Sequence, residues 1–504
     1  MKTDYIIIQA GGLGTRLGHL TKNKPKAIVP VNNLPIIFHL FQKYPDKKFI
    51  IIGDYKFDVL KKYLQNFAKV QYMLVQAQGA GNGAGVKEAL TYVPDDTPFM
   101  LIWSDLILAD SFSADELEEG CYVALAGDFP CSWRFENGVL EKVASSEHGV
   151  AGMFLFDKKS YFKDLPSPCR FTKWLQEQQL PLKELPLKGT AEVGTVEAIR
   201  RIDSGENRCR PYNHMEFTED TVRKTGLTEE GKQLIKREVK WYRAVSEYGF
   251  NQIPKIVSYD PLVMERIYGE NIFKAELTEA QKKQTIDRLV ESLDKLHNFE
   301  EADMDYFGLQ EDYFNKTMNR LHSIRNVIPF ADKEYIRING VDCKNVFYFQ
   351  NELEQMVHDR LFDAKFGPIH GDCTLTNTMI DKNGDIYFID ARGYFGKRDI
   401  VGDVYYDWAK LYYSIDGCFD QFNIKNFELD ITETEIQYQI ASSGWEHLTA
   451  YFLEKIPDCD IFKIKLIHAI VWLSLASHCW EDYDSLCLAF YNGLYLWNEL
   501  MADQ

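Results

Sequence analysis

The chain has 504 residues, which is more than one hydrophobic core normally serves and excludes a small single-domain protein. Its 45% hydrophobic and 14% aromatic content excludes a mainly disordered chain. The formal net charge is −18 and the basic residues are dispersed, so nucleic acids and anionic membranes are disfavoured as partners and small molecules are favoured.

Targeting and redox features predict a cytoplasmic protein. The apolar run near the first residue is too short for a signal-peptide core. No window reaches the roughly 18 continuous apolar residues of a membrane span. The ten cysteines lie far apart and form neither a CxxC pair nor a Cys/His cluster. This pattern predicts reduced thiols and no zinc site.

Short β-rich runs alternate with helical patterns from residue 5 to about residue 204. Strands are expected at 5–9, 48–54, 70–76 and 98–108, and further ones near 122–127, 138–143 and 152–156. Helices are expected at 35–44, 57–67 and 82–93. This alternation is typical of βαβ units around a parallel sheet.

A second pattern begins after residue 204. Strands are expected within 214–226 and 253–269, separated by a helix at 229–249. From about residue 277 the pattern is mainly helical, interrupted only by a loop and β-hairpin at 367–393. We therefore predict two domains, 1–204 and 205–504, the second with an N-lobe at about 210–270 and a helical C-lobe at about 271–504.

A glycine-rich turn follows the first strand in QAGGLGTRLGHLTKNKPKAIVPV. Gly11, Gly12 and Gly14 let backbone amides approach an anionic ligand without obstruction by Cβ atoms. Arg16 adds a bidentate donor, and Lys26 adds a point charge where negative charge develops during attack on an α-phosphate. The sequence therefore predicts a triphosphate site here.

These residues resemble the sugar-phosphate and phosphocholine nucleotidyltransferases, whose signature is GGxGTRLxPxT followed by PKxxxPV. The resemblance covers residues 1–204 and implies a Rossmann-like nucleotidyltransferase sheet sandwich. His19 replaces the usual proline of the signature. The resemblance implies a further nucleotide contact from Thr15 in the GTRL turn. It also implies nucleobase contacts from Gln76 or Gln78, and from Gly79 and Gly81 at the GAGNGAG turn.

The same resemblance implies two magnesium ligands. Asp105 follows an apolar strand, where a catalytic metal ion is expected in an α/β sheet. Glu192 stands beside Gly194 and Thr195 in AEVGT, where the family more often has an aspartate, so it is either the second ligand or a solvated carboxylate. A substrate phosphate would attack the α-phosphorus of a nucleoside triphosphate, and pyrophosphate would leave.

Three polar residues in IHGDCTLTNTMIDKNGDIYFIDARG predict a second reaction. Phosphoryl transfer to an alcohol needs one carboxylate to orient the hydroxyl and accept its proton, and an amide and another carboxylate to hold magnesium. Asp372, Asn377 and Asp390 fit these three tasks in that order. Cys373 lies inside the motif, and we expect it only to pack the loop.

These residues resemble the aminoglycoside phosphotransferase and choline kinase superfamily, relatives of the protein kinases, over residues 210–504. The resemblance implies a bilobal, protein-kinase-like α+β fold in which Lys224 holds the ATP phosphates and Glu238 pairs with Lys224. The backbone near Met264, Glu265 and Arg266 would be the hinge that binds adenine. The catalytic loop is residues 370–377. Asp403 and Asp407, the two aspartates of GDVYYDWAK, would brace this loop rather than react.

The acceptor should contact the helical lobe, which is rich in aromatic residues. They would either cage a quaternary ammonium by cation–π attraction, stack on a sugar, or simply form the core. The residues concerned are Trp408, Tyr412, Tyr413, Trp445, Trp472, Trp480 and Trp497.

Fusion of the two sites indicates consecutive reactions, because a kinase makes the phosphate ester that this type of nucleotidyltransferase consumes. We expect a bifunctional enzyme that uses Mg²⁺ at both sites, ATP, and CTP or another NTP to make a CDP-linked headgroup such as CDP-choline or CDP-ethanolamine. The alternatives are a sugar 1-kinase joined to a sugar-1-phosphate nucleotidyltransferase, or one active half joined to a binding module. A homo-oligomer stays open.

Overall fold

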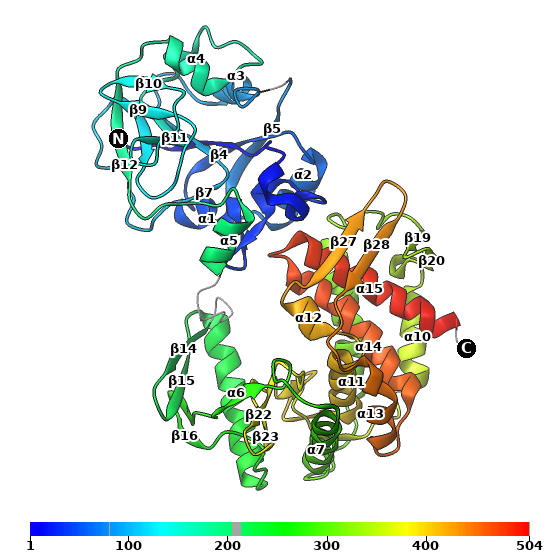
Figure 1. The fold of residues 1–504 in the computed structure, drawn as a ribbon. Coiled ribbons are helices and arrows are strands. Elements are labelled where there is room, and N and C mark those ends of the chain that lie inside the picture. Colours follow the sequence, from blue (N-terminus) through cyan, green and yellow to red (C-terminus); the bar gives the residue numbers. More distant parts are fainter. Residues whose placement is uncertain (80, 204–212, 503–504) are drawn as a thin grey trace. The chain divides into compact units, whose positions relative to one another are not determined.

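The computed structural model describes residues 1–79, 81–203 and 213–502. The chain forms two compact units (Figure 1). The first unit is Met1–Arg208 with Glu481–Asp484, and the second is Cys209–Trp480 with Ser485–Gln504. The expected domain boundary after residue 204 lies outside the described residues, and residues 481–484, expected in the second domain, group with the first unit.

One mixed sheet forms the centre of the first unit. Strand β1 (Tyr5–Gln9) lies between β4 (Lys48–Gly53) and β6 (Phe99–Trp103) and is parallel to both. Because both faces of β1 are covered, Ile6, Ile7 and Ile8 are fully buried, as expected for a continuous apolar run. The remaining strands of this sheet are β5 (Gln71–Gln76), β8 (Cys121–Ala126), β9 (Arg134–Glu136), β10 (Val139–Glu141), β11 (Gly149–Phe156) and β12 (Leu182–Leu187).

The sheet is not purely parallel, because β11 pairs antiparallel with β6. The helix expected at 82–93 starts only after Gly85, whose φ of 79° is outside the helical range, and it consists of α3 (Val86–Ala89) and a short 3₁₀ turn. The other helices and short strands are α1 (Ile36–Lys43), α2 (Phe57–Phe67), α4 (Phe171–Glu177), α5 (Val196–Asp203), β2 (Pro30–Val31), β3 (Leu34–Pro35), β7 (Leu106–Ile107) and β13 (Ala191–Glu192).

A buried charge cluster holds the segment Glu481–Asp484 in the first unit. The Lys24 ammonium is 1% exposed and lies 2.8 Å from an oxygen of Asp482 and 2.6 Å from an oxygen of Asp484. Asn23 donates a further hydrogen bond to Asp484. Lys24 is therefore paired twice, as a buried cation requires.

The second unit begins with a four-stranded antiparallel sheet in the order β14, β15, β17, β16. Helix α6 (Glu229–Glu247) packs beside it (Figure 1) and starts at Thr228, whose side chain accepts a hydrogen bond from the Gly231 N–H. The strands are β14 (Asn213–Phe217), β15 (Thr221–Gly226), β16 (Ile256–Tyr259) and β17 (Leu262–Glu265).

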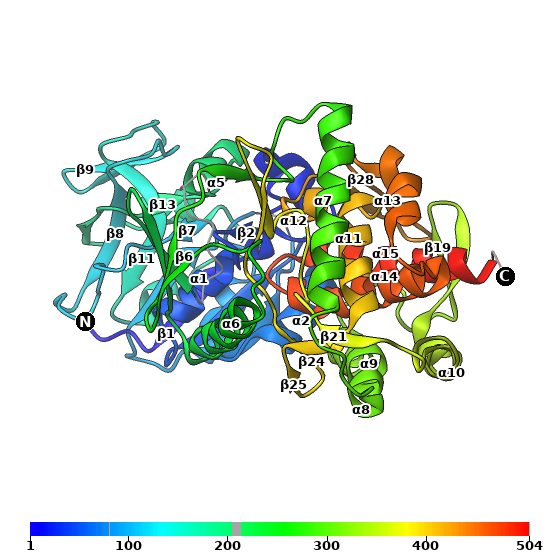
Figure 2. The ribbon, with the colours of Figure 1, turned by 90° about the horizontal axis from the view of Figure 1, so that it is seen from below.

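The rest of the second unit is mainly helical, and α11 and α14 pack against each other (Figures 1 and 2). An apolar stretch at Ile461–Cys479 is as long as a membrane span, but 67% of it is buried inside the protein, as in a core helix. The helices are α7 (Glu279–His297), α8 (Tyr306–Gln310), α9 (Lys316–Ile324), α10 (Gln350–Leu361), α11 (Val404–Ile415), α12 (Phe419–Asn423), α13 (Thr449–Lys455), α14 (Ile461–Leu475) and α15 (Tyr483–Ala502).

The expectation that only residues 367–393 interrupt the helices is wrong. A second four-stranded sheet is built from two hairpins, β19 (Tyr335–Ile338) with β20 (Val341–Lys344), and β27 (Phe427–Ile431) with β28 (Ile436–Ile440). The turn of the first hairpin is Asn339-Gly340, with φ of 47° and 81°. Asn-Gly favours this tight turn, so the sequence carried a signal for the hairpin.

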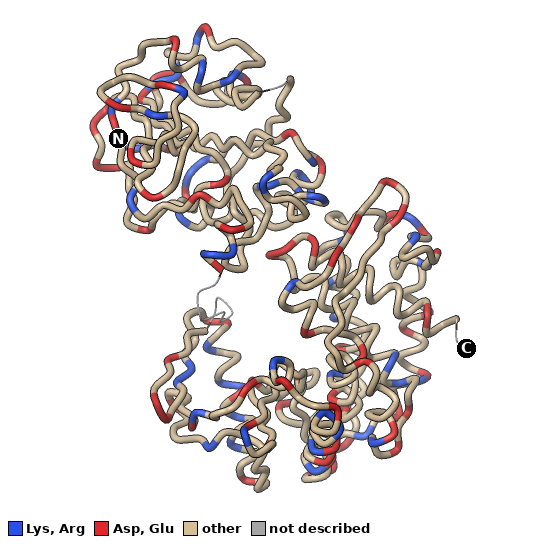
Figure 3. Tube along the Cα trace, viewed as in Figure 1, with Lys and Arg blue, Asp and Glu red and all other residues tan. Residues whose placement is uncertain are grey.

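The catalytic loop lies between two strands, as expected. It follows β21 (Phe366–Pro368) and leads into the hairpin formed by β22 (Thr378–Asp381) and β23 (Ile386–Phe388). The neighbouring short strands are β18 (Gly269–Asn271), β24 (Tyr394–Phe395), β25 (Arg398–Asp399) and β26 (Val401–Asp403). In both units, acidic and basic residues are interspersed along the chain (Figure 3).

Candidate active sites in the two units

The glycine-rich turn and Asp105 meet at one edge of the first sheet. The turn follows β1 and Asp105 follows β6, and because these neighbouring strands are parallel, their carboxyl ends lie together. Gly14 has a φ of 64°, which favours glycine. A Cβ atom on Gly11 would lie 2.8 Å from Cβ of Asp54, so the close approach of the two segments also needs glycine.

Lys26 and Asp105 form a direct ion pair at this edge. Both are buried, and the Lys26 ammonium contacts Oδ2 of Asp105. Oδ1 of Asp105 is buried and has no hydrogen-bond partner among the described residues. A buried carboxylate oxygen without a partner is costly, so Asp105 has a free ligand position for a cation.

Glu192 and Arg16 complete the predicted set. Strand β13 pairs with β7, which places Glu192 opposite Leu106 and joins the Val193 N–H to the Asp105 carbonyl at 2.9 Å. Nη2 of Arg16 lies 3.0 Å from Oε1 of Glu192.

The donor set of the first unit fits magnesium. No cluster of three or more His, Cys, Asp or Glu side chains suited to a metal occurs in the described parts of the chain. Mg²⁺ is commonly held by one or two carboxylates together with substrate phosphates. Asp105 and Glu192 are the candidates for these two carboxylates, and the glycine-rich turn would supply the phosphates' binding site.

The predicted nucleobase segment is exposed, and its glycines also pack against a neighbouring segment. Gln76 ends β5 and is exposed, as is Gln78, so both amides are accessible to a ligand. A Cβ atom on Gly79 would lie 3.0 Å from the Pro168 ring, and one on Gly81 would lie 2.4 Å from the Cys169 carbonyl oxygen. The close packing of this turn against residues 168–170 therefore explains why both positions are glycine.

Gly12 and Thr15 lie exposed in the glycine-rich turn, and no atom would obstruct a Cβ atom on Gly12. Sequence reasoning missed Gln9, the last residue of β1. Its Nε2 is buried without a hydrogen-bond partner among the described residues. A polar residue that ends an apolar strand just before the turn was the available signal.

In the second unit, Lys224 lies between two carboxylates. Its ammonium is 2.7 Å from Oε2 of Glu238 and 2.5 Å from Oδ1 of Asp390. Burial raises the pKa of Glu238 to about 7, and the charge of Lys224 opposes this shift. Burial alone would lower the pKa of Lys224, but Asp390 and Glu238 together raise it above its ordinary value. Lys224 therefore remains an ammonium.

The catalytic loop is held by several hydrogen bonds. Asn377 donates from Nδ2 to Oδ2 of Asp372 at 2.8 Å. Asp407 accepts hydrogen bonds from the backbone N–H groups of His370 and Gly371 at 2.8 and 2.7 Å. Cys373 is fully buried, and its thiol donates to the Asp407 carbonyl. Asp407 braces the loop directly, and Cys373 packs it.

Asp403 has another task than the one expected. It caps α11 by accepting a hydrogen bond from the Tyr405 N–H at 2.9 Å, and it also accepts one from the Tyr313 hydroxyl at 2.7 Å. Burial raises its pKa to about 6. Asp403 thus positions the helix that carries Asp407, and it does not contact the catalytic loop by a hydrogen bond.

The expected hinge contacts are wrong for two backbone N–H groups. The Glu265 N–H donates to the Lys255 carbonyl and the Arg266 N–H to the Asp220 carbonyl, each at 2.8 Å, so neither can donate to adenine. In the strand register Glu265 pairs with Thr221, and its side chain points away from the face that carries Lys224. Met264 does lie on the same face as Lys224 and is buried.

Sequence reasoning also missed Lys410 and Asp420. The Lys410 ammonium lies 2.9 Å from Oδ1 of Asp372, in a buried position over the ring of Tyr413. Asp420 is fully buried and accepts a hydrogen bond from the Thr376 N–H at 3.0 Å. Burial raises the pKa of Asp420 to about 6. The only signal for Lys410 was its position one helical turn after Asp407.

Most of the aromatic residues considered for the acceptor belong to the core. Six of them are at most 4% exposed, namely Trp408, Tyr412, Tyr413, Trp445, Trp472 and Trp497. Trp480, the seventh, is partly exposed.

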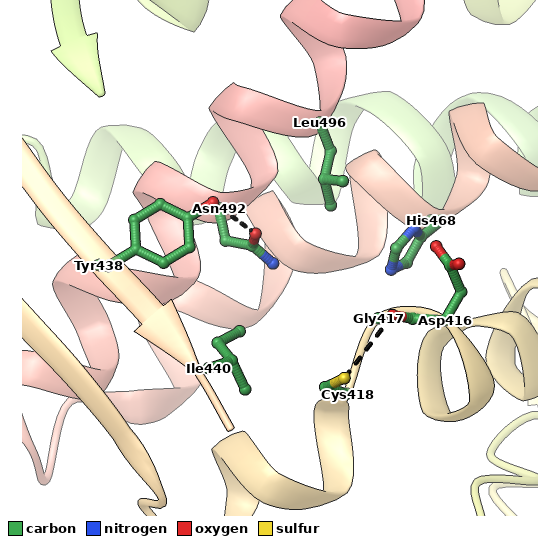
Figure 4. A pocket seen from close by; sticks show the side chains of 8 residues that line it. All are labelled: Asp416, Gly417, Cys418, Tyr438, Ile440, His468, Asn492 and Leu496. Atoms are coloured by element: carbon green, nitrogen blue, oxygen red, sulfur yellow. Dashed lines mark hydrogen bonds between the residues drawn. The ribbon is translucent and has the colours of Figure 1, made fainter. Parts of the chain in front are cut away.

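A cavity of about 190 Å³ lies further along the helical lobe (Figure 4). It is lined by Asp416, just after α11, and by His468 and Tyr438, whose hydroxyl donates to Asn492 at 2.7 Å. Burial lowers the pKa of His468 to about 3, so this side chain is neutral.

Comparisons with known proteins agree with the two sites. Residues 5–118 match the model of the family described as nucleotidyl transferase. Residues 222–420 match the model described as phosphotransferase enzyme family. Both are enzyme families, so the two resemblances seen in the sequence are confirmed, as is the α/β class with its kinase-like second part. The chain thus joins a nucleotidyl transferase segment to a phosphotransferase segment.

Similar curated proteins include sugar-phosphate nucleotidyltransferases. The bifunctional protein GlmU of Methanocaldococcus jannaschii is 30% identical over 169 residues, which are 31% of this chain and 40% of that protein. A D-glycero-α-D-manno-heptose 1-phosphate guanylyltransferase of Campylobacter jejuni is 34% identical over 96 residues, 18% of this chain and 43% of that protein. A glucose-1-phosphate cytidylyltransferase of Salmonella typhimurium is 30% identical over 126 residues, 20% of this chain and 49% of that protein.

The chain thus spans about two fifths to a half of the length of these relatives. Among solved structures, the inositol-1-phosphate CTP transferase of T. maritima is 17% identical, with a TM-score of 0.33, over 40% of this chain and 97% of that one.

Proposed function

We propose that the chain is a bifunctional enzyme that phosphorylates a hydroxyl group of a small metabolite with ATP and then transfers a nucleotidyl group to the new phosphate. The acceptor is a sugar or polyol, the nucleotide is CTP, and the product is CDP-linked. The observation that carries the proposal is the presence of two charged sites on one chain, Lys26 with Asp105 and Lys224 with Glu238 and Asp390.

In the kinase reaction, Asp372 would orient the acceptor hydroxyl and accept its proton while the oxygen attacks the γ-phosphorus. The bond to the β-phosphate oxygen breaks, and ADP leaves. Lys224 would bind the α- and β-phosphates, and Glu238 would hold Lys224 in place. Asp390 and Asn377 are the residues that would hold Mg²⁺, which supplies charge neutralisation at the phosphates.

In the second reaction, an oxygen of the new phosphate attacks the α-phosphorus of CTP, and pyrophosphate leaves. The glycine-rich turn would cradle the triphosphate, and Lys26 would stabilise the charge that develops at the α-phosphate. Arg16 would contact phosphate oxygens as a bidentate donor. Asp105 and Glu192 would hold Mg²⁺. The exposed amides of Gln76 and Gln78 are the proposed contacts to the base.

The sugar or polyol acceptor replaces the amino alcohol that was first expected. Six of the seven aromatic side chains expected to form a cage for a quaternary ammonium are buried in the core, so they are not exposed to bind one. Lys410 also brings a cation to Asp372, where the acceptor hydroxyl would bind. The relatives named for heptose 1-phosphate and glucose 1-phosphate act on sugar phosphates. One of them is a guanylyltransferase and the other a cytidylyltransferase, so the activity test should include all four NTPs.

The cytoplasm is the proposed compartment. None of the nine cysteines in the described residues is part of a disulfide, in keeping with a reducing environment. ATP and CTP are both available there.

Mass spectrometry of the purified chain with ATP, Mg²⁺ and each NTP would test the proposal against a panel of sugars, polyols, choline and ethanolamine. We expect a phosphorylated sugar or polyol with ATP alone, and a CDP-linked product once CTP is added. Asp372→Asn should abolish the first product. Asp105→Asn should leave the first product and abolish the second. A CDP-amino-alcohol product would refute the acceptor, and activity that survives both substitutions would refute the site assignments.

A further inference from the structure

A cluster of cations lies beside the catalytic loop of the second unit. Lys316 and Arg320 stand one turn apart on α9, and Arg392 follows Asp390 by two residues. Nη2 of Arg392 and the Lys316 ammonium share one carboxylate, Asp312, at 3.0 and 2.6 Å. Two of the three cations therefore share a single carboxylate.

Arg320 is the member without a carboxylate. Its Nη1 donates to the Ser474 hydroxyl at 2.7 Å, and it makes no ion pair with any described residue. Burial lowers the pKa of Arg320. Tyr406 opposes this shift, the charge of Arg392 adds to it, and Tyr394 and Asp312 oppose it, so that the pKa stays below its ordinary value. A partly buried guanidinium without a counter-ion is unfavourable, and an external anion would relieve it.

A nearby tyrosine reports the same excess of positive charge. Tyr394 lies under the Arg392 guanidinium, 4.2 Å from ring centroid to guanidinium carbon. Burial alone would raise the pKa of Tyr394, but the charges of Arg392 and Lys316 lower it below its ordinary value. The potential in this region therefore favours a negative group.

The cluster adjoins the residues that would carry out phosphoryl transfer. A Cβ atom on Gly371, the residue before Asp372, would lie 3.1 Å from Cβ of Arg392. Arg392 also donates from Nη1 to the Tyr406 hydroxyl at 2.9 Å, and Tyr406 belongs to α11, the helix of Lys410. Arg392 thus borders the catalytic loop, and Asp312 joins Arg392 to Lys316.

We infer that the acceptor of the phosphotransferase unit carries its own anionic group, a phosphate monoester or a carboxylate, which binds Arg320, Lys316 and Arg392. The inference rests on the proposed kinase function and names its substrate class. A purely structural role accounts for only part of the cluster, because Asp312 pairs with Arg392 and Lys316 and accepts the Gly396 N–H at 3.0 Å, but leaves Arg320 without a carboxylate.

Isothermal titration calorimetry on the full chain, saturated with Mg²⁺ and a non-hydrolysable ATP analogue, would test this inference. The titrants are matched sets of a neutral sugar or polyol, its phosphate monoester and its carboxylate counterpart, with choline as a cationic probe. We expect an anionic member to bind at least about tenfold more tightly than its neutral parent and than choline. The two anionic arms distinguish phosphate from carboxylate.

Variants localise the effect. Arg320→Gln should weaken binding of the anionic compound by about 10- to 100-fold and leave the neutral parent unchanged. Arg320→Lys, which keeps the charge, should retain most of the preference. Arg337→Gln, an exposed arginine on β19, is the matched control and should have no effect.

Equal binding of neutral and anionic compounds, or a preference that survives Arg320→Gln, would overturn the inference. Incubation of the tightest binder with ATP then tests the proposed function separately. Binding that depends on Arg320 without any ADP formation would refute the kinase reaction and leave the anion site in place. ADP formation with a neutral or cationic acceptor would refute only the anion site.

Discussion

Lys410→Met removes the buried cation that contacts Asp372. The Lys410 ammonium is 2.9 Å from Oδ1 of Asp372, and the side chains are 9% and 28% exposed. At an effective dielectric constant of about 20, two unit charges at this distance attract by about 6 kcal/mol before desolvation is subtracted. Loss of a hydrogen bond to a charged group has a net cost of about 1.5–3 kcal/mol. If this cost falls on the transition state, kcat for phosphoryl transfer drops by about 10- to 150-fold.

A coupled assay for ADP, with the acceptor identified by mass spectrometry, would measure this loss. We expect the KM for ATP to stay unchanged, because the ATP phosphates would bind Lys224 rather than Lys410. The acidic limb of the pH profile of kcat should move to higher pH, because Asp372 loses a neighbouring positive charge that favours its ionised form. A merely structural lysine would not move this limb.

Lys344→Met is the matched control, since Lys344 pairs with Glu352 at 2.7 Å on the surface of the same unit. Surface pairs contribute little, so neither kcat nor the pH profile should change. The smallest expected loss of kcat in Lys410→Met is about 10-fold. A kcat within about twofold of the wild type would therefore refute the predicted role of Lys410. A parallel loss of nucleotidyl transfer would instead indicate misfolding.

Three further predictions separate catalytic from structural charges. Lys26→Met should lower nucleotidyl transfer by at least about 100-fold and leave the kinase reaction unchanged. Lys24→Met should leave both reactions unchanged but lower the free energy of unfolding, measured by calorimetry, by about 3–5 kcal/mol, because it leaves two buried aspartates without a cation. The opposite pattern would reverse the two roles. The pKa of Asp420 rises from 3.8 to about 6, so its stabilising contribution is complete below pH 3.8 and is lost as the pH rises through 6. Urea unfolding should therefore show Asp420→Asn gaining about 3 kcal/mol relative to wild type between pH 4 and pH 8, and a constant difference would contradict the shift. Lys224→Met should lower phosphoryl transfer by at least about 100-fold and leave nucleotidyl transfer intact, and equal losses in both assays would contradict independent sites.

Motifs and the family resemblances that they carry selected several residues that the structure brings into contact. The resemblance implied that Lys224 pairs with Glu238, and the structure shows this pair together with a contact from Lys224 to Asp390. Periodicity and turn residues had placed the three residues on a strand, on the following helix and after a hairpin. Lys26 and Asp105 meet for a similar reason, since parallel neighbouring strands bring their carboxyl ends together. Motif and element order thus carried the main features of both candidate sites.

Other contacts have no local signature. Lys410 reaches Asp372 only because α11 packs against the catalytic loop, and its position in DWAKL looks like an ordinary amphipathic helix position. Arg320 has an unpaired charge only because Asp312 is already shared by Lys316 and Arg392. The hinge prediction is wrong for the N–H groups of residues 265 and 266, because these groups donate to the Lys255 and Asp220 carbonyls.

The two enzyme classes and the α/β and kinase-like folds are predictable from local patterns, because glycine-rich turns, strand ends and HGDxxxxN loops are recognisable from residue spacing. The same patterns nominate the charged residues of each candidate site. Which aromatic residues are core, and which cation lacks a carboxylate partner among the described residues, becomes clear only in the folded protein. Burial and charge balance depend on every element packed around a side chain, and these elements come from distant parts of the chain.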